Sequence, residues 1–466
     1  MTDSASNSHA VAEDAGAGET IAAVSTPPGR GGIGIVRLSG PESASIAAQL
    51  VRLRHPLEHA RARLADVLDD SECSATRIDE AVVTFFQSPN SYTSENVVEI
   101  ATHGSPAVLE FLLRRAVALG ARLAEPGEFT QRAFISGRID LTQAEAVRDL
   151  IEAQTLTQAR QAAGQMGGAL SRRVAPVKGS LLELIALLEA GIDFAEDDLD
   201  VTPRAEIARR ISDLAPPLTA LESSFARGRI VHDGLTLAIV GRPNVGKSSL
   251  FNRLVERDRA IVTASPGTTR DLVTECISLD GIPLELVDTA GLREGLEEAE
   301  QLGIARSREA LADAALVLVV LDATQPLNQE ERNLLAAVDG RPALVAVNKS
   351  DLAGKRAGAN IGHLPAISTS ALTGEGIQAL RQRLIELATS GAASEPGMLT
   401  NLRQHQAIST ARAALAEAAQ ANAGAIPHEM ILLDLYRALW ALDSLTGQTT
   451  PDDILNLIFS TFCIGK

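Results

Sequence analysis

The sequence predicts a chain of three parts that combines α/β with all-α structure. These parts are an N-terminal α/β domain, a helical domain that is discontinuous in sequence, and a second α/β domain inserted between its halves. Three observations predict this fold class. The chain has 466 residues, which is too many for one hydrophobic core. Apolar residues recur at helical spacing in two separated stretches, and between these stretches short apolar runs alternate with helical segments, as in a parallel sheet.

Composition and charge limit the possible functions. Hydrophobic residues make up 45% of the chain and aromatic residues 3%, so aliphatic helices and β-branched strands are expected to form the cores. The net charge of -17 disfavours general nucleic-acid binding, because phosphate contacts need Lys and Arg. Three cysteines, Cys73, Cys276 and Cys463, have no disulfide or metal-ligand spacing. The longest apolar run, 314–321, is too short to span a bilayer, so a soluble, cytoplasmic protein without membrane contact is expected.

Five segments are expected along the chain. Residues 1–20 lack Lys, Arg and an apolar core, so they are expected to form a disordered acidic arm and not a targeting peptide. Residues 21–137 alternate strand-like and helix-like runs and form the N-terminal domain. Residues 138–233 and 389–466 are expected to form the two halves of the helical domain, and residues 234–388 the inserted domain.

A phosphate-binding loop follows the first strand expected in the inserted domain. The run 235–240 leads into Gly241-Arg-Pro-Asn-Val-Gly-Lys247-Ser248, which has the G-x4-G-K-S pattern. Glycines in such a loop let backbone N–H groups surround the phosphates, while Lys247 reaches the terminal phosphates and Ser248 ligates Mg2+. The motif therefore predicts a nucleoside triphosphate site.

Three further motifs, in chain order, predict that the nucleotide is GTP. Asp288-Thr-Ala-Gly291 follows an apolar run, so that Asp288 would hold Mg2+ indirectly and the Gly291 amide would meet the γ-phosphate. Asn348-Lys-Ser-Asp351 follows another, and a carboxylate at Asp351 can accept from guanine N1–H and N2–H, a donor pair that adenine lacks. The segment 370–372 would supply a backbone amide to guanine O6. Together the motifs predict a Ras-like P-loop G domain that hydrolyses GTP.

The residue after the second motif raises a question about hydrolysis. Ras-type enzymes place a water-orienting Gln directly after D-x-x-G, and this chain has Leu292 there. The acidic stretch 294–300 is the nearest alternative source of a water-positioning group. A solvated charged loop is the commoner meaning of such a run.

Five more motifs lie elsewhere along the chain. They are Thr26-Pro-Pro-Gly-Arg-Gly-Gly-Ile-Gly34, Pro126-Gly-Glu-Phe129, Leu141-Thr-Gln-Ala-Glu-Ala146, Gly267-Thr-Thr-Arg-Asp271 and the terminal Phe462-Cys-Ile-Gly-Lys466. With the nucleotide motifs, they closely resemble the MnmE (TrmE) family of tRNA-modification GTPases over residues 21–466. The terminal motif is highly specific.

The resemblance implies a reaction, cofactors and partners. The N-terminal domain is expected to bind a tetrahydrofolate derivative (methylene or formyl) and to form a homodimer, which a FAD-dependent flavoprotein completes to a heterotetramer. GTP, Mg2+ and K+ are implied as further cofactors. The implied reaction adds a carboxymethylaminomethyl or aminomethyl group to carbon 5 of the wobble uridine of certain tRNAs. The tRNA is expected to dock largely on the flavoprotein, which agrees with the acidic charge of this chain.

The resemblance also implies roles in GTP hydrolysis. Asn244, Thr263, Ser265 and Thr268 match K+ ligands, Ser248 and Thr269 match Mg2+ ligands, and Glu300 matches a glutamate that positions the attacking water, which answers the question raised by Leu292. The full set expected at the GTP site is Asn244, Val245, Gly246, Lys247, Ser248, Ser249, Thr263, Ala264, Ser265, Pro266, Gly267, Thr268, Thr269, Asp288, Thr289, Ala290, Gly291, Asn348, Lys349, Ser350, Asp351, Ser370, Ala371 and Leu372.

For folate, the resemblance implies binding by Arg37, Glu99, Arg138 and Lys466. Arg138 stands where the family more often has lysine, and its planar guanidinium differs in geometry from an ammonium. Cys463 is a candidate catalytic thiol, because a nearby cation such as Lys466 could lower its pKa. Two alternatives stay open: Cys463 attacks or activates the uridine or the one-carbon unit, or the tail only closes the pocket.

A different class of function must be weighed against this one. The protein could be a regulatory GTPase switch, for example in ribosome assembly, without one-carbon chemistry. The nucleotide motifs fit both classes. The first 137 residues and the terminal Cys463 favour the enzyme, because a switch needs neither a folate pocket nor a terminal thiol.

Overall fold

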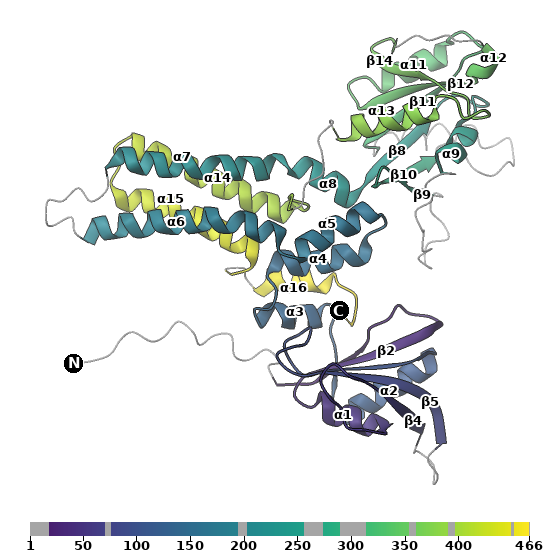
Figure 1. Cartoon of the computed structure of the whole chain (residues 1–466). Coiled ribbons are helices and arrows are strands. Elements are labelled where there is room, and N and C mark those ends of the chain that lie inside the picture. The colour runs from purple at the N-terminus through teal and green to yellow at the C-terminus, as the bar shows by residue number, and fades with distance from the viewer. Residues whose placement is uncertain are drawn as a thin grey trace. The chain divides into compact units, whose positions relative to one another are not determined.

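The computed structural model describes residues 18–69, 76–193, 203–255, 274–288, 314–353, 360–389, 397–448 and 452–465 (Figure 1). The chain divides into two compact units. Residues Met1–Glu145 and Thr446–Lys466 belong to the first unit, and Ala146–Leu445 to the second. In the described ranges, no helix combines the length and the apolar character needed to cross a membrane.

The first unit is built on a mixed sheet whose strand order is β3-β4-β5-β6-β2-β1-β7. The strands are β1 Ile21–Val24, β2 Gly31–Ser39, β3 Val51–Leu53, β4 Ala62–Asp69, β5 Thr76–Phe86, β6 Val97–Gly104 and β7 Arg122–Leu123. Neighbouring strands are antiparallel except β1 and β7, which are parallel. Helices α1 Ser43–Leu50 and α2 Pro106–Ala118 contribute Ile46 and Leu112 to the core of this sheet.

The C-terminal end of the chain is part of the first unit. Helix α16 (Asp452–Ser460) packs on α3 (Glu128–Ile135), and the ring centroids of Phe134 and Phe459 are 6.2 Å apart. Beyond α16, Ile464 forms an antiparallel bridge with Pro126. The C-terminal segment therefore packs on residues 126–135 of the N-terminal domain.

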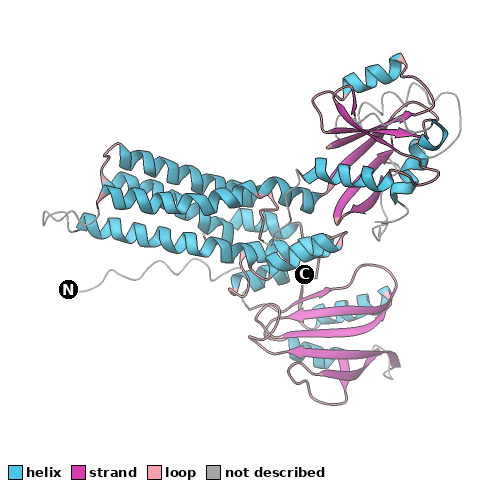
Figure 2. Cartoon of the chain, turned by 45° about the horizontal axis from the view of Figure 1, so that its top comes forward, coloured by secondary structure: helices cyan, strands magenta, loops and turns pink. Residues whose placement is uncertain are grey.

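The second unit contains a helical part assembled from both sides of the inserted domain: α6 and α7, in teal, lie beside α14 and α15, in yellow-green and yellow (Figure 1). Figure 2 shows this part as a bundle of helices. Its helices are α4 Leu141–Glu152 (from Ala146 onward), α5 Leu156–Met166, α6 Ala169–Asp193, α7 Arg204–Ser223, α8 Phe225–Asp233, α14 Leu402–Ala423 and α15 His428–Thr446 (up to Leu445). One apolar core joins Leu184 of α6 and Leu218 of α7 to Leu415 of α14 and Leu442 of α15. Because these side chains come from before and after the inserted domain, the predicted discontinuous helical domain is confirmed.

The inserted part is a largely parallel sheet in the order β13-β14-β12-β11-β8-β10-β9. Its elements are β8 Leu235–Val240, α9 Lys247–Val255, β9 Thr274–Leu279, β10 Ile282–Asp288, β11 Leu316–Asp322, α11 Gln329–Ala337, β12 Ala343–Asn348, α12 Ser350–Ala353, β13 Asn360–Ile361, β14 Leu364–Ser368 and α13 Ile377–Thr389. Two apolar clusters cover its faces, one around Phe251 and Leu384 and one around Val319 and Val345. Burial on both faces explains the continuous apolar strands. The carboxyl ends of the parallel strands β8, β10 and β12 lie at one edge, where the predicted nucleotide motifs begin.

Candidate functional site

The phosphate loop connects the end of β8 to the start of α9. Gly241, Asn244 and Gly246 have φ angles of 154°, 63° and 94°, which curl the backbone between the two elements. A Cβ atom on Gly246 would lie 2.3 Å from Asn348 Nδ2, so this position requires glycine. The loop thus ends at a helix N-terminus, where unpaired N–H groups favour an anion.

Lys247 lies inside this loop. It is 8% exposed, and its ammonium donates to the carbonyl oxygens of Gly241 at 2.7 Å and Arg242 at 2.9 Å. These contacts hold the charge within the loop that the sequence predicts to receive the phosphates. Burial of a lysine is unusual without such partners.

The side chains of Asn348 and Lys349 connect the end of β12 to the phosphate loop. Asn348 Nδ2 donates to the Val245 carbonyl at 2.9 Å, and Lys349 Nζ donates to the Asn244 carbonyl at 2.8 Å. Lys349 Nζ also lies 2.8 Å from Asp322 Oδ2 at the end of β11. Burial alone would raise the pKa of Asp322, but Lys349 and Thr324 outweigh it and lower that pKa to about 2. An ionised carboxylate therefore anchors Lys349 over the loop.

The segment 370–372 meets the same cluster. Ala371 N donates to Asn348 Oδ1 at 3.0 Å, and Ser370 Oγ donates to Asp351 Oδ1 at 2.6 Å. The structure thereby brings together three of the predicted motifs: the phosphate loop, 348–351 and 370–372. An exposed carboxylate at Asp351 beside a fixed backbone loop is the arrangement that base recognition needs.

Several predicted residues lie outside the described residues. They are Thr263, Ala264, Ser265, Pro266, Gly267, Thr268, Thr269, Thr289, Ala290, Gly291, Glu300 and Lys466, together with Leu292. Asp288 is described by its main chain alone, as the last residue of β10, where it pairs with Ile239 of β8.

In the first unit, Arg37 joins the predicted folate residues to the tail. It is paired across β2 and β6 with Glu99, and its Nη2 lies 2.8 Å from Glu99 Oε1. Its Nη1 donates to the Gly465 carbonyl at 3.0 Å, which also accepts from Ser25 Oγ at 3.1 Å. The guanidinium lies 5.9 Å from the centroid of the Tyr92 ring. Arg37 is thus held by a carboxylate, a ring and the tail backbone.

Arg138 lies near the same carboxylate. With Glu99 and Tyr92 it lines a cavity of about 570 Å3, whose other lining residues are Phe86, Pro89, Asn90, Ser91 and Val97. Cys463 has an exposed side chain, while its carbonyl accepts from Gly127 N at 3.5 Å. The structure therefore places Glu99 and Arg138 on one cavity, and ties Arg37 both to Glu99 and to the tail.

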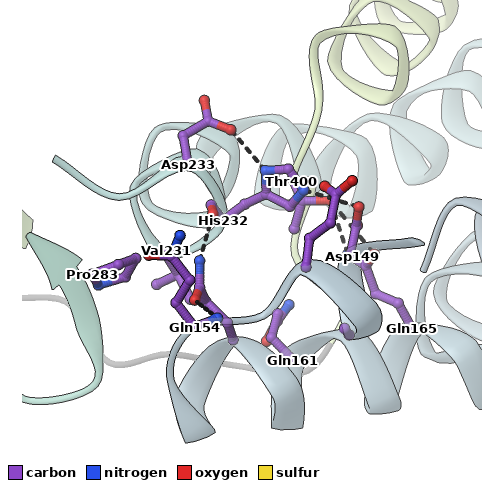
Figure 3. Close-up of a pocket in the computed structure, with 12 residues that line it drawn as sticks. Asp149, Gln154, Gln161, Gln165, Val231, His232, Asp233, Pro283 and Thr400 are labelled. Carbon is purple, nitrogen blue, oxygen red and sulfur yellow. Dashed lines mark hydrogen bonds and ion pairs between the residues drawn. The ribbon is translucent and has the colours of Figure 1, made fainter. Parts of the chain in front are cut away.

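A second polar cavity, of about 280 Å3, lies in the second unit among α4, α5 and α8 (Figure 3). Its lining includes Asp149, Gln158, Gln161, Gln165 and His232. Gln158 Nε2 donates to the His232 carbonyl at 2.7 Å, which fixes the last turn of α8. Since α8 leads directly into β8, this cluster supports the strand that carries the phosphate loop.

Some contacts were not anticipated from the sequence. Asp322 could have been suspected, because it is a polar residue at the end of a buried apolar strand. Ser25, Tyr92 and His232 carry no local signal, since their partners are set by tertiary register.

The inserted domain has a G-x4-G-K-S loop between a parallel strand and a helix, with an N-K-x-D segment bonded to that loop. These features define the chain as a P-loop GTPase. Family models described as the MnmE helical domain and the GTP-binding protein TrmE N-terminus match residues 141–463 and 20–138. The chain belongs to the MnmE (TrmE) family, and the resemblance predicted from its motifs is confirmed.

Relatives match the chain over nearly its whole length. The tRNA modification GTPase MnmE of Koribacter versatilis is 57% identical, over 96% of this chain and 99% of that protein. The protein of the same name from Symbiobacterium thermophilum is 43% identical, over 96% of this chain and 99% of that protein. Among solved structures, the G domain of the T. maritima FeoB iron transporter is 28% identical, covering 33% of this chain and 98% of that one, with a TM-score of 0.25.

Proposed function

We propose that this protein is a K+-dependent GTPase that works with a FAD-dependent flavoprotein on tRNA. It uses a folate one-carbon unit to add a carboxymethylaminomethyl or aminomethyl group to carbon 5 of the wobble uridine of certain tRNAs, acting in the cytoplasm. One observation carries the coarser part, a GTP hydrolase of tRNA modification: 57% identity over 96% of the chain to a protein of that name. The finer chemistry rests on the residues considered below.

GTP is proposed to bind with its phosphates in the loop 241–249. Lys247 contacts the terminal phosphates, and Ser248 and Thr269 hold Mg2+. Asp288 holds Mg2+ indirectly, and the Gly291 amide meets the γ-phosphate. Guanine is read by Asp351 and by the backbone of 370–372. The hydrogen bonds from Asn348 to Val245 and from Ala371 to Asn348 support this, because they connect the phosphate loop to the two segments proposed to recognise the base.

K+ is proposed to replace an arginine finger, bound by Asn244, Thr263, Ser265 and Thr268, while Glu300 positions the water. Asn244 supports this from the described residues, because its left-handed backbone and its contact with Lys349 fix it at the bend of the loop. A finger contributes about 10³–10⁵-fold to the rate. GTP turnover is therefore expected to be at least about tenfold faster in KCl than in NaCl of equal ionic strength.

The variant Glu300→Ala is expected to lose turnover in KCl while it binds GTP like the wild type. Equal wild-type rates in the two salts would exclude the cation mechanism. Loss of nucleotide binding by Glu300→Ala would instead assign that residue a structural role.

A reduced folate is proposed to bind at Arg37, Glu99, Arg138 and Lys466. The Arg37–Glu99 ion pair and the cavity shared by Glu99 and Arg138 support this, since a pterin edge presents both donors and acceptors. Equilibrium binding of methylene- or formyl-tetrahydrofolate tests it. Glu99→Gln is expected to weaken binding about tenfold or more, as loss of a charged hydrogen-bond partner would.

Glu110→Gln provides the matched control, because Glu110 is an exposed helix residue paired with Arg114. A wild-type protein that binds no reduced folate would favour the alternative, a regulatory switch without one-carbon chemistry. The proposed homodimer and the heterotetramer with the flavoprotein are tested by sedimentation of the protein alone and in mixture.

A further inference from the structure

The side chain of Arg253 links the helix after the phosphate loop to the loop proposed to read guanine. Arg253 lies on α9, and its Nε donates to the Ala371 carbonyl at 2.8 Å. Its Nη2 donates to the carbonyl of the next residue, Leu372, at 2.7 Å. The planar guanidinium therefore donates two hydrogen bonds to two successive carbonyl groups. No motif in the sequence points to this residue.

These two hydrogen bonds determine the orientation of the backbone N–H groups of Leu372 and Thr373. In a trans peptide the C=O and N–H bonds point in opposite directions, so holding the Ala371 carbonyl also orients the N–H of Leu372. Holding the Leu372 carbonyl orients the N–H of Thr373, which donates to Ser370 Oγ at 3.1 Å. Hydrogen bonds from a charged donor are stronger than those between neutral groups. Arg253 can therefore fix the loop against thermal displacement.

Arg253 holds this part of the loop from the side of α9. The Leu372 side chain is 77% exposed, so it does not anchor the loop by packing. Asn348, the last residue of β12, accepts from the Ala371 amide, and Asp351 of α12 accepts from the Ser370 hydroxyl. Arg253 contributes the contact from the helix that begins in the phosphate loop.

We propose that Arg253 is a positioning residue for guanine recognition. It holds the segment 370–372 in the position in which a backbone amide can donate to guanine O6. It also connects α9, which begins in the phosphate loop, to the loop that contacts the base. This inference rests on the proposed GTP site. It predicts a selective loss: recognition at position 6 of the base depends on Arg253, whereas recognition at position 2 depends on Asp351.

Binding of three nucleotides distinguishes the contact at position 6 of the base from the contact at position 2. 6-Thio-GDP keeps the N1–H and N2–H donors but replaces O6 by sulfur, a weaker acceptor. IDP keeps O6 and N1–H but lacks the 2-amino group. Dissociation constants for GDP, 6-thio-GDP and IDP would be measured with the full-length protein for the wild type, Arg253→Ala, Arg253→Lys and Asp351→Asn. Arg383→Ala serves as a control, because Arg383 pairs with Glu386 on the exposed side of α13.

Arg253→Ala is expected to weaken GDP binding about tenfold and to reduce the preference for GDP over 6-thio-GDP at least threefold, with the preference for GDP over IDP unchanged. Arg253→Lys keeps the charge but lacks the planar guanidinium, so its GDP affinity and its preference for GDP over 6-thio-GDP are expected to lie between those of the wild type and Arg253→Ala. Asp351→Asn should reduce the preference for GDP over IDP. Arg383→Ala should leave both preferences, GDP over 6-thio-GDP and GDP over IDP, unchanged.

An Arg253→Ala protein that discriminates against 6-thio-GDP like the wild type would overturn the inference. So would a fall in both ratios together, which would indicate general loosening of the site. A wild-type protein with no preference for GDP would instead refute the proposed GTP site, so the two failures can be told apart.

Discussion

His232 Nε2 lies 3.0 Å from Asp149 Oδ1, and this contact joins the end of α8 to α4 (Figure 3). On its other side, His232 Nδ1 lies 2.7 Å from Asp233 Oδ1. Among the described residues, Asp149 Oδ1 has no well-aligned hydrogen bond, so its contact with the imidazole is best described as a charge pair. Asp149, helped by Asp233, raises the pKa of His232 to about 9 against the effect of burial. The imidazole is therefore cationic at neutral pH.

This pair predicts a pH dependence of stability. The folded-state pKa of about 9 lies above the usual value of about 6.5, so the stabilisation is fully present below pH 6.5 and is lost as the pH rises through 9. Asp149→Asn is expected to lower the free energy of unfolding by about 1–3 kcal/mol at pH 6.5 and to flatten its pH dependence up to pH 9.5. Urea unfolding followed by circular dichroism measures this.

Proton NMR titration of the His232 ring checks the same pair directly. Its pKa should fall towards 6.5 in Asp149→Asn. Glu152→Gln is the matched control, because Glu152 lies on the same helix with a side chain 60% exposed. A His232 that titrates near 6.5 in the wild type would contradict the assignment.

Asp351→Asn should change the base that the protein prefers. The carboxylate accepts two N–H donors from guanine, and an amide can accept only one while offering a donor instead. GTP affinity is expected to fall about 100-fold or more, because a charged hydrogen-bond partner is lost, while the affinity for xanthosine triphosphate is expected to rise. Calorimetric titration with GTP and with xanthosine triphosphate measures both affinities. A variant that binds GTP as tightly as the wild type would refute the assignment of Asp351 to guanine recognition.

Gly465→Ala should displace the tail. Gly465 has a φ of 93°, and a Cβ atom there would lie 2.5 Å from the Val24 carbonyl oxygen. The substitution is therefore expected to break the contacts of Arg37 and Ser25 with the Gly465 carbonyl and to reduce tRNA modification about tenfold or more, with GTP turnover within twofold of the wild type.

Gly120→Ala is the matched control for that variant. Gly120 has a φ of 105°, but nothing lies within 4 Å of its would-be Cβ atom. It therefore imposes similar backbone strain without displacing the tail. Equal modification by both variants would show that the position of the tail does not matter.

Removal of residues 463–466 should abolish tRNA modification and leave GTP binding intact, because the nucleotide site belongs to the other compact unit. The exposed thiol of Cys463 leaves two roles for the tail. Cys463→Ser separates them when modified tRNA is quantified by mass spectrometry. Loss of modification would assign the thiol a chemical role, and near-normal modification would leave the tail the structural role of closing the pocket.

Much of the fold could be predicted because its signals are local. The apolar runs 235–240, 284–287 and 344–347 lie within β8, β10 and β12, since strands covered on both faces consist of consecutive apolar residues. The helical spacing of apolar residues likewise predicted helices, and Leu181, Leu184 and Leu188 of α6 lie in their buried core. The strand ends then bring the nucleotide motifs to one edge of the sheet.

Other parts of the site could not be predicted, because they depend on packing between distant segments. Arg253 and Ala371 are 118 positions apart, and nothing in the local sequence of α9 indicates their contact. The charge pair of Asp149 and His232 depends in the same way on how α4 and α8 meet. Arg37 and Glu99 became candidates through the family resemblance, and only the β2–β6 register explains why they pair.

Nucleoside mass spectrometry of tRNA most directly tests whether the GTPase activity of this protein serves wobble-uridine modification. The tRNA would be taken from a strain that lacks the gene, and from the same strain supplied with the wild type or with Lys247→Ala. We predict that 5-carboxymethylaminomethyl and 5-aminomethyl uridines are lost without the gene, return with the wild type and stay absent with Lys247→Ala. Wobble uridines that remain fully modified in the strain without the gene would contradict the proposed function.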